Sequence, residues 1–515
     1  MNHERNDNPT VRTSAGTVRG RREDGLDVFR GIRFAEPPVG DLRFAAPRPA
    51  SPWTGVRDAA QFGPPPPQDV GSFRDRLPPD WDPLAGERGR EGDWLTVNVW
   101  TPSASATTPR PVMVWIYGGA YKVGSADSPG YDAQRIARDG DVVVMTFNHR
   151  VGIEGFAAIE GAPANRGLLD QVAALEWVRD NIAAFGGDPD QVTVFGESAG
   201  AGCVASLLAM PRADGLFRRA IIQSMPGTFL SYELAAAVGR AIAAECGRHS
   251  TVRDLAAVPP HELVLAGESL AARQHEFEKQ WGQLASHDTL FAPVVDGDAL
   301  PTTPWQALSG GAARGVDLIV GHTRDECQLF LVMRGRAGRI TQQQATGALN
   351  VFGPGRDGGK YRDAFPAATA EQLYVQVQTD WLFRMPALQL AEAQTAGGGR
   401  AYLYELAWEA PGANGLLGAC HGLDLPLLFG TFGESLGPLL FGSEPTEEAY
   451  AAAAQLRETW TTFAATGDPG WPAYDPEHRT TQIFDEVTTV AAYPEEQSRL
   501  LWQGFPFSTL QLLEG

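Results

Sequence analysis

Residues 192–200, Val-Thr-Val-Phe-Gly-Glu-Ser-Ala-Gly, decide the fold of this chain. The apolar or β-branched residues Val192 to Phe195 are typical of a buried strand, and the small apolar residues of 201–210 (AGCVASLLAM) are typical of a helix. A sharp turn between them requires glycine on both sides of Ser198, because larger side chains would collide there. The pattern predicts a serine exposed at a strand end, with helix N–H groups beside it.

Apolar runs upstream of this segment predict a parallel sheet. VMVWIYGG (112–119) and DVVVMTFNHR (141–150) are apolar on both faces, as in strands buried between helices. Residues 168–185 carry apolar side chains at helical spacing and end at a Gly-Gly-Asp-Pro stop signal. Strand, helix and strand in this order form a βαβ unit, which predicts an α/β fold with a mostly parallel sheet.

The rest of the chain continues the alternation of strands and helices. We predict further strands at 17–20, 26–34, 94–100, 316–321 and 401–408, and helices at roughly 233–247, 369–395 and 446–465. No internal repeat or low-complexity linker divides the sequence. We therefore expect one large domain over residues 1–515, with helical insertions.

Composition excludes several classes of protein. The 515 residues are 43% hydrophobic and carry a net charge of −20, from 42 Lys+Arg and 62 Asp+Glu, which excludes disorder and argues against nucleic-acid or anionic-membrane partners. The N-terminus lacks the apolar core of a secretory signal, and no window approaches 18 apolar residues. Four cysteines form no disulfide framework and no metal-binding spacing. We expect a cytoplasmic protein without metal or cofactor.

A serine at such a turn can act as a nucleophile if other groups assist it. The Gly-rich turn at 117–121 (YGGAY) follows a strand and could direct backbone N–H groups at Ser198. His421, in GACHGLDLP, is the candidate base because it lies downstream of both the serine and an acid. Glu326, in GHTRDECQLF, is the candidate acid, and its neighbour Asp325 remains a rival.

The bare G-x-S-x-G pattern also occurs at 433–437 (GESLG). No small-residue helix follows Ser435, since Pro438, Phe441 and Gly442 come next. The motif also lies too late in the chain to have an acid and a histidine downstream. We therefore do not expect Ser435 to be a nucleophile.

Together these segments resemble the type-B carboxylesterases, the α/β-hydrolase family of para-nitrobenzyl esterase and the cholinesterases. The resemblance covers nearly the whole chain: VFRGIRFAEPPVGDLRFAAPRP (28–49), LTVNVWTP (95–102), NHRVGIEGF (148–156), 164–200, GLFRRAIIQS (215–224), FAPVVDGDALP (291–301), GHTRDECQLF, GACHGLDLPLLFG (418–430) and WTTFAATGDPGWPAY (460–474). It implies the α/β-hydrolase fold. It also implies site roles: Ser198 as nucleophile, Glu326 as acid, His421 as base, Gly119, Ala120 and Ala199 as oxyanion-hole amides, and Ser224 as a support for the acid.

The chain departs from the family pattern at four places. Cys327 replaces the glycine usual after the acid, and Met225 replaces the glycine of a QSG segment, so either could reshape the pocket floor. Pro66 and Trp94 stand where many members have cysteines of a disulfide. The joint loss of both partners fits a reducing compartment. Features of the loop from about 66 to 94 are therefore not transferred.

The resemblance implies hydrolysis of carboxylic esters through an acyl-serine, without cofactor or metal. We expect uncharged esters of short and medium acyl length, because residues near the motifs are apolar: Tyr121, Phe291, Leu329, Phe330, Trp381 and Phe383. An amide or carbamate hydrolase would carry the same triad, and a non-catalytic binding protein can share the fold. Oligomeric state stays open.

Overall fold

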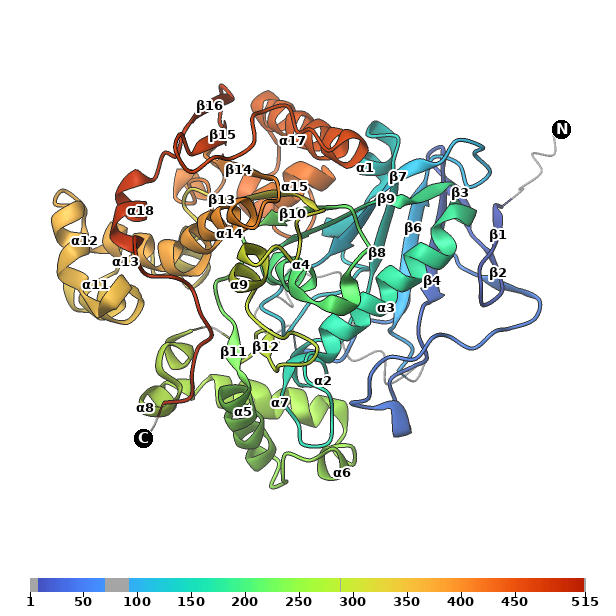
Figure 1. The fold of residues 1–515 in the computed structure, drawn as a ribbon, viewed down its shortest axis with the longest axis horizontal. Helices are drawn as coiled ribbons and strands as arrows, with labels where there is room; N and C mark the ends of the chain where they lie inside the picture. The colour runs from blue at the N-terminus through green and yellow to red at the C-terminus, as the bar shows by residue number, and fades with distance from the viewer. Residues whose placement is uncertain (1–7, 70–91, 288, 514–515) are drawn as a thin grey trace.

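A mixed sheet of eleven strands runs through the centre of the molecule (Figure 1). The computed structural model describes residues 8–69, 92–287 and 289–513. The strand order is β16-β15-β14-β13-β10-β9-β7-β8-β6-β4-β3, and neighbours are parallel from β15 through to β8. The mostly parallel, helix-flanked sheet predicted from the sequence is thus confirmed.

Seven strands of the large sheet (β4, β6, β7, β8, β9, β13 and β14) overlap predicted runs, whereas β3, β10, β15 and β16 were not predicted. The strands of the large sheet are β3 (Arg21–Glu23), β4 (Leu26–Arg33), β6 (Thr96–Thr101), β7 (Arg110–Ile116), β8 (Val143–Phe147), β9 (Gly187–Glu197), β10 (Arg219–Gln223), β13 (Asp317–Thr323), β14 (Ala401–Leu406), β15 (Thr480–Phe484) and β16 (Thr489–Ala492). Residues 17–20 contribute instead to a separate three-stranded sheet of β1 (Thr10–Arg12), β2 (Thr17–Arg19) and β5 (Val56–Asp58). A third sheet pairs β11 (Leu230–Ser231) with β12 (Val294–Val295).

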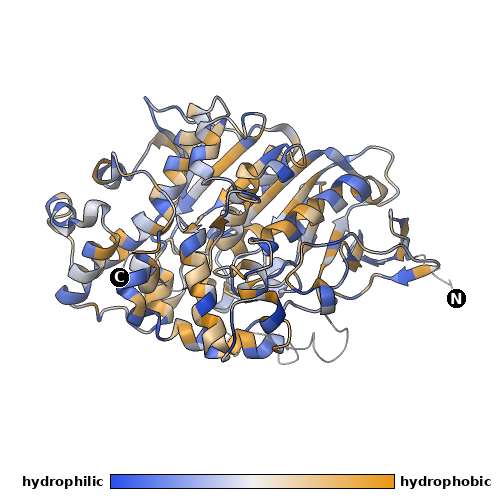
Figure 2. Ribbon diagram, turned by 60° about the horizontal axis from the view of Figure 1, so that its bottom comes forward, coloured by the Kyte–Doolittle hydropathy of each residue, from blue (hydrophilic) through white to orange (hydrophobic). Residues whose placement is uncertain are grey.

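Helices cover both faces of the central sheet (Figure 1). The longer ones are α3 (Arg166–Asn181), α4 (Ala199–Ala209), α5 (Tyr232–Glu245), α7 (Pro260–Ala271), α11 (Gln342–Phe352), α13 (Ala370–Thr379), α14 (Met385–Ala396) and α17 (Glu447–Thr466). Hydrophobic residues concentrate on the strands and on the helix faces that pack against them (Figure 2). Among the described residues, no helix is both long and apolar enough to cross a membrane.

The helix predicted at 369–395 is interrupted. Between α13 and α14 the chain makes a π-helical turn at Asp380–Arg384. Both of these side chains are buried and form an ion pair, and Arg384 Nη2 also donates to the Arg324 carbonyl at 2.5 Å. A buried charge must be paired, so these tertiary contacts favour the local bulge over the regular helix that the side-chain spacing predicts.

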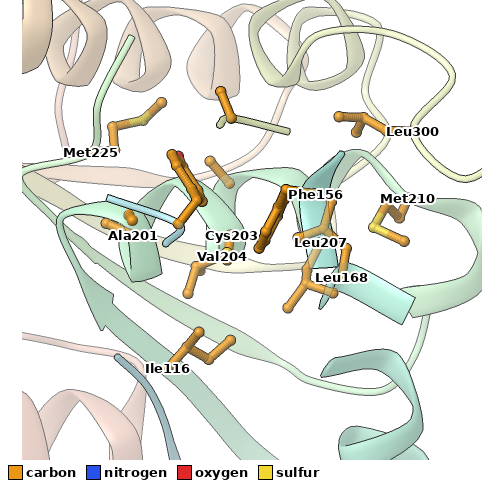
Figure 3. Packing of buried hydrophobic residues seen from close by; sticks show 14 of the residues in the cluster. Ile116, Phe156, Leu168, Ala201, Cys203, Val204, Leu207, Met210, Met225 and Leu300 are labelled. Carbon is orange, nitrogen blue, oxygen red and sulfur yellow. The ribbon is translucent and has the colours of Figure 1, made fainter. Parts of the chain in front are cut away.

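Helix α4, which follows the sharp turn at Ser198, packs through small residues. Figure 3 shows Cys203, Val204 and Leu207 of α4 in one buried cluster with Phe156 and Leu168. Small side chains are required along this helix because its neighbours approach closely. A Cβ atom at Gly202, for example, would lie 2.0 Å from the Tyr121 hydroxyl.

The parallel arrangement gathers several loops at one edge of the sheet. The carboxyl ends of β7, β9, β13 and β14 point the same way, so the segments that follow them can meet. These segments carry the YGGAY turn, Ser198, Glu326 and His421. The expectation of a single domain over residues 1–515 stays a prediction.

Candidate active site

Ser198 lies at a strained turn between β9 and α4. Its backbone has φ 56° and ψ −127°, a conformation that an ordinary residue adopts only under tertiary constraint. A Cβ atom at Gly200 would lie 2.0 Å from the Ile116 carbonyl oxygen, and one at Gly196 would lie 2.7 Å from Gly200. The two glycines are thus required for β9, β7 and α4 to meet, and the turn leaves the Ser198 side chain partly exposed.

The YGGAY turn packs directly against Ser198. A Cβ atom at Gly118 would lie 3.0 Å from the Ser198 Cβ atom. Gly119 and Ala120 have positive φ (113° and 56°), which turns their amides away from regular pairing. In the described part of the chain, neither amide donates a hydrogen bond, and the Ala199 amide lies in the first turn of α4, where no intrahelical acceptor exists. Three N–H groups are therefore available to a negatively charged oxygen beside the serine.

His421 and Glu326 form a buried, short hydrogen bond. His421 Nδ1 lies 2.6 Å from Glu326 Oε2, and the backbone amide of His421 donates to the Glu326 carbonyl at 3.1 Å. The Thr323 amide donates to Glu326 Oε1 at 2.9 Å. Burial acts to raise the pKa of Glu326, but the His421 charge and these hydrogen bonds outweigh it and hold the pKa below its ordinary value. An ionised Glu326 would keep the imidazole proton on Nδ1 and leave Nε2 facing the cavity.

Ser224 lies next to this carboxylate. It is fully buried after β10, with φ 55°, and its amide donates to the Gly321 carbonyl at 2.9 Å. Its hydroxyl contributes to lowering the pKa of Glu326, although the contact lacks regular hydrogen-bond geometry.

Two further carboxyl groups surround His421, and neither stood out as a site residue in the sequence. Glu197 Oε1 lies 3.1 Å from His421 Nε2. Asp424, at the start of α15 (Asp424–Phe429), accepts from Gln223 Nε2 at 2.5 Å. Burial raises the pKa of Glu197 to about 8 and that of Asp424 to about 6. In the sequence, Glu197 directly precedes Ser198 and Asp424 follows His421 by three residues. These positions could have indicated that both carboxyl groups lie near the site.

The imidazole titrates under the influence of these groups. Burial alone would lower the pKa of His421, but the charges of Glu197 and Glu326, with the hydrogen bond to Glu326, raise it to about 9. No hydrogen bond joins Ser198 Oγ to His421 among the described residues, because Nε2 faces Glu197 instead. Catalytic hydrogen bonds often tighten only when substrate binds.

Replacement of Glu197 by glutamine should move the pH profile. If His421 is the general base, only its neutral form is active, and activity should fall as pH drops through its pKa. Because the Glu197 charge raises that pKa, Glu197→Gln should shift the acid limb of kcat/KM to lower pH by about one unit. Glu434→Gln, the same change in the second G-E-S-x-G segment, is the matched control. An unchanged midpoint in Glu197→Gln would show that Glu197 does not act on His421.

The cavity in front of Ser198, here called the serine cavity, has a volume of about 350 Å³. Ser198, Glu197, His421 and the YGGAY turn line it. Of the six apolar residues predicted to line it, four do: Tyr121, Leu329, Phe330 and Phe383. The ring centroids of Phe383 and Phe330 lie 4.4 and 5.2 Å from that of His421.

The other two assignments were wrong. Phe291 is buried in the core. The ring centroid of Trp381 lies 4.6 Å from that of Phe352, and Trp381 lines a neighbouring pocket instead. The departures from the family pattern also lie elsewhere: Met225 is buried beside α4 (Figure 3), and Cys327 lines the neighbouring pocket. The predicted change to the pocket floor is therefore not seen at either residue. The loop from about 66 to 94 lies mostly outside the described residues.

The rival residues have different surroundings. Ser435 lies at the rim of the serine cavity, 3.4 Å from the Ser128 hydroxyl, and is exposed. Asp325 pairs with Arg324 and accepts from the Ala419 amide at 3.0 Å. The structure therefore brings His421 together with Glu326 and not with Asp325.

Cys420, adjacent to His421, should be dispensable for catalysis. Its side chain is buried and free, and burial raises the pKa of the thiol, so it carries little thiolate. Cys420→Ala should retain a substantial fraction of kcat, as should the control Cys203→Ala, which changes a buried cysteine of α4. Loss of kcat as deep as that of Ser198→Ala would contradict this arrangement.

The chain is similar to known proteins over nearly its full length. A sequence model described as "Carboxylesterase family" matches residues 7–352 and 360–500. The chain is 37% identical over 502 residues to a para-nitrobenzyl esterase of Bacillus subtilis (strain 168), covering 95% of this chain and 97% of that protein. It is 35% identical over 480 residues to a phenmedipham hydrolase of Pseudarthrobacter oxydans, covering 90% and 93%.

Solved structures show the same architecture. A Geobacillus stearothermophilus carboxylesterase at pH 6.2 superposes with a TM-score of 0.83 at 35% identity, covering 96% of this chain and all of that one. A thermophilic PNB esterase gives a TM-score of 0.83 at 36% identity, covering 96% and 99%. The chain therefore belongs to the carboxylesterase family and is a carboxylic ester hydrolase with the α/β-hydrolase fold.

Proposed function

We propose that the chain hydrolyses esters through an acyl-enzyme on Ser198. His421 Nε2 accepts the proton of Ser198 Oγ while Oγ attacks the ester carbonyl carbon. The amides of Gly119, Ala120 and Ala199 donate to the oxyanion, and Glu326 stabilises the imidazolium. His421 then protonates the departing alkoxide oxygen. Water attacks the acyl-enzyme with His421 again as base, which releases the acid and restores Ser198.

One observation carries this proposal: the 2.6 Å hydrogen bond between His421 and Glu326 borders the cavity that also holds Ser198 and three unpaired amides. Ser224, buried beside Glu326, supports the ionised acid. The mechanism requires His421 Nε2 to exchange Glu197 for Ser198 Oγ when substrate binds.

We infer uncharged esters of short and medium acyl length as substrates. The apolar walls of the serine cavity (Tyr121, Leu329, Phe330, Phe383) support neutral acyl and alcohol groups, as does the similarity to a para-nitrobenzyl esterase. The test is kcat/KM for acetyl, butyryl, octanoyl and palmitoyl para-nitrophenyl esters and for butyrylthiocholine. We expect the acetyl to octanoyl esters to dominate and the choline ester to be poor. A palmitoyl optimum, with a rate jump above its solubility limit, would contradict this class.

A second candidate activity is carbamate hydrolysis. The similarity to a phenmedipham hydrolase favours it, since the same nucleophile can accept a carbamoyl group. Matched substrates with one leaving group, an aryl butyrate, an aryl N-phenylcarbamate and the corresponding anilide, would separate the activities by kcat/KM. We expect the ester to be fastest, and a faster carbamate would reverse the assignment.

We further propose a cytoplasmic protein that does not bind nucleic acid. None of the four cysteines, all of which are described, forms a disulfide, which supports this location, and the net charge of −20 supports this absence of binding. Cell fractionation with an antibody against the chain tests the location.

A further inference from the structure

A second pocket lies behind one wall of the serine cavity. It has a volume of about 310 Å³ and shares His287, Phe330 and Leu382 with the serine cavity. Ser198, His421 and the YGGAY turn do not line it. It is enclosed by α10 (Gln328–Met333), α11, α13 and the π-helical turn at Asp380–Arg384. We call it the arginine pocket.

Two guanidinium groups line the arginine pocket, from Arg334 and Arg336, and none of the described residues that line it carries a carboxylate. Arg336 is half-buried, and its Nη1 donates to the Tyr374 hydroxyl at 3.3 Å. No carboxylate pairs with Arg336 among the described residues, and Glu371, on the nearby helix α13, accepts from the Gly338 amide instead.

Two other half-buried arginines, by contrast, each have an acid partner. Arg30 pairs with Glu23 at 2.7 Å, and Arg43 pairs with Glu154 at 2.6 Å. A guanidinium has five N–H donors in a planar fork that matches a carboxylate. In a protein with a net charge of −20, a cation without an internal acid partner beside a pocket indicates a site for an external anion.

The remaining walls are apolar and aromatic: Leu331, Val351, Phe352, Trp381 and Leu382. Inorganic anions would gain nothing from such walls, whereas an apolar tail would be buried by them. We propose that the arginine pocket binds an organic carboxylate with an apolar tail, with its head group at Arg336 and its tail against Phe352 and Trp381.

Such a ligand would lie behind residues that adjoin the catalytic groups. Phe330 lies between the two cavities, and its ring centroid is 5.2 Å from that of His421. Cys327, which also lines the arginine pocket, directly follows Glu326 in the chain. A ligand bound in the arginine pocket would therefore limit the movement of Phe330 and of the segment that carries Glu326.

Calorimetric titration of the full-length protein with octanoate, in the absence of ester, tests the proposal. Binding needs no turnover, so the result is independent of the catalytic assignment. Arg336→Gln removes the charge, and Gly347→Phe fills the pocket from α11, where a Cβ atom would meet no atom within 4 Å. Arg339→Gln is the matched control, since Arg339 is exposed and does not line the pocket.

We expect both pocket variants to weaken octanoate binding by about tenfold or more, and the control by less than about twofold. Octanamide, which lacks the charge, should bind at least about tenfold more weakly than octanoate. Equal binding by wild type and both pocket variants, no binding at all, or equal binding of octanamide would overturn the proposal. If circular dichroism shows that Arg336→Gln is unfolded, Gly347→Phe alone decides.

Two sources supply this ligand chemistry: the acid released by the enzyme and free medium-chain fatty acids. Butyrate represents the product of a short ester, and octanoate represents the fatty acid. Tighter butyrate binding supports a product site, and tighter octanoate binding supports a fatty-acid site.

Discussion

Ser198→Ala should lower ester turnover by several orders of magnitude, about 10⁴-fold or more in kcat. The substitution removes the only atom that can form the acyl-enzyme in our proposal and leaves the turn between β9 and α4 in place. Its melting temperature should stay close to that of wild type, since alanine removes one oxygen from a partly exposed side chain. The measurement is kcat for para-nitrophenyl butyrate, together with labelling by a fluorophosphonate probe.

Ser435→Ala is the matched control. Ser435 lies in a second G-E-S-x-G segment, lines the same cavity and also has positive φ (50°), but no strand leads into it and no small-residue helix follows it. This variant should keep nearly all activity, and the probe should label Ser198 alone. Labelling of Ser435, or full activity in Ser198→Ala, would falsify the assignment of the nucleophile.

Glu326→Gln should lower kcat by about 10³- to 10⁴-fold. A carboxylate at 2.6 Å from Nδ1 both fixes the imidazole tautomer and stabilises the imidazolium that forms during attack. Glutamine has the same shape, but it carries no charge and can present an N–H group to Nδ1, which would place the proton on Nε2. Because the residue is fully buried, a melting curve should accompany the kinetics.

The control for this variant is the neighbouring acid. Asp325→Asn should retain most activity, because an asparagine oxygen can still accept from the Ala419 amide at this position. If Asp325→Asn were inactive and Glu326→Gln active, the acid of the triad would be Asp325. The pair therefore separates the two acids that the sequence left open.

The buried strands and the sharp turn at Ser198 were predictable because both depend on residues that are close together in the chain. Strands buried on both faces require continuous apolar residues, and the steric need for Gly196 arises within one turn, where a Cβ atom would meet Gly200. The helix from 369 to 395 was predicted as one element because its periodicity is nearly regular. Its π-helical turn depends on the contact of Arg384 with the Arg324 carbonyl, 60 residues away, which periodicity does not report.

Pocket lining was predicted less well. Phe383 and Trp381 are two residues apart, yet Phe383 stacks on His421 while Trp381 faces the arginine pocket. Successive side chains of a helical segment point in different directions, so closeness in sequence to a site does not place a side chain in it. The same argument applies to Phe291, which lies in the core.

The amino-acid sequence by itself determined the strand-turn-helix around Ser198, the parallel sheet that carries it, and the order of serine, acid and histidine along the chain. Only the tertiary structure decided which groups surround the imidazole. Glu197 and Glu326 approach His421 from two other segments of the chain, and the resulting pKa of the imidazole depends on burial and on charges within a few ångströms. Electrostatic interactions act through space and fall off with distance, so they are fixed when packing brings distant segments together, and no local pattern of residues encodes them.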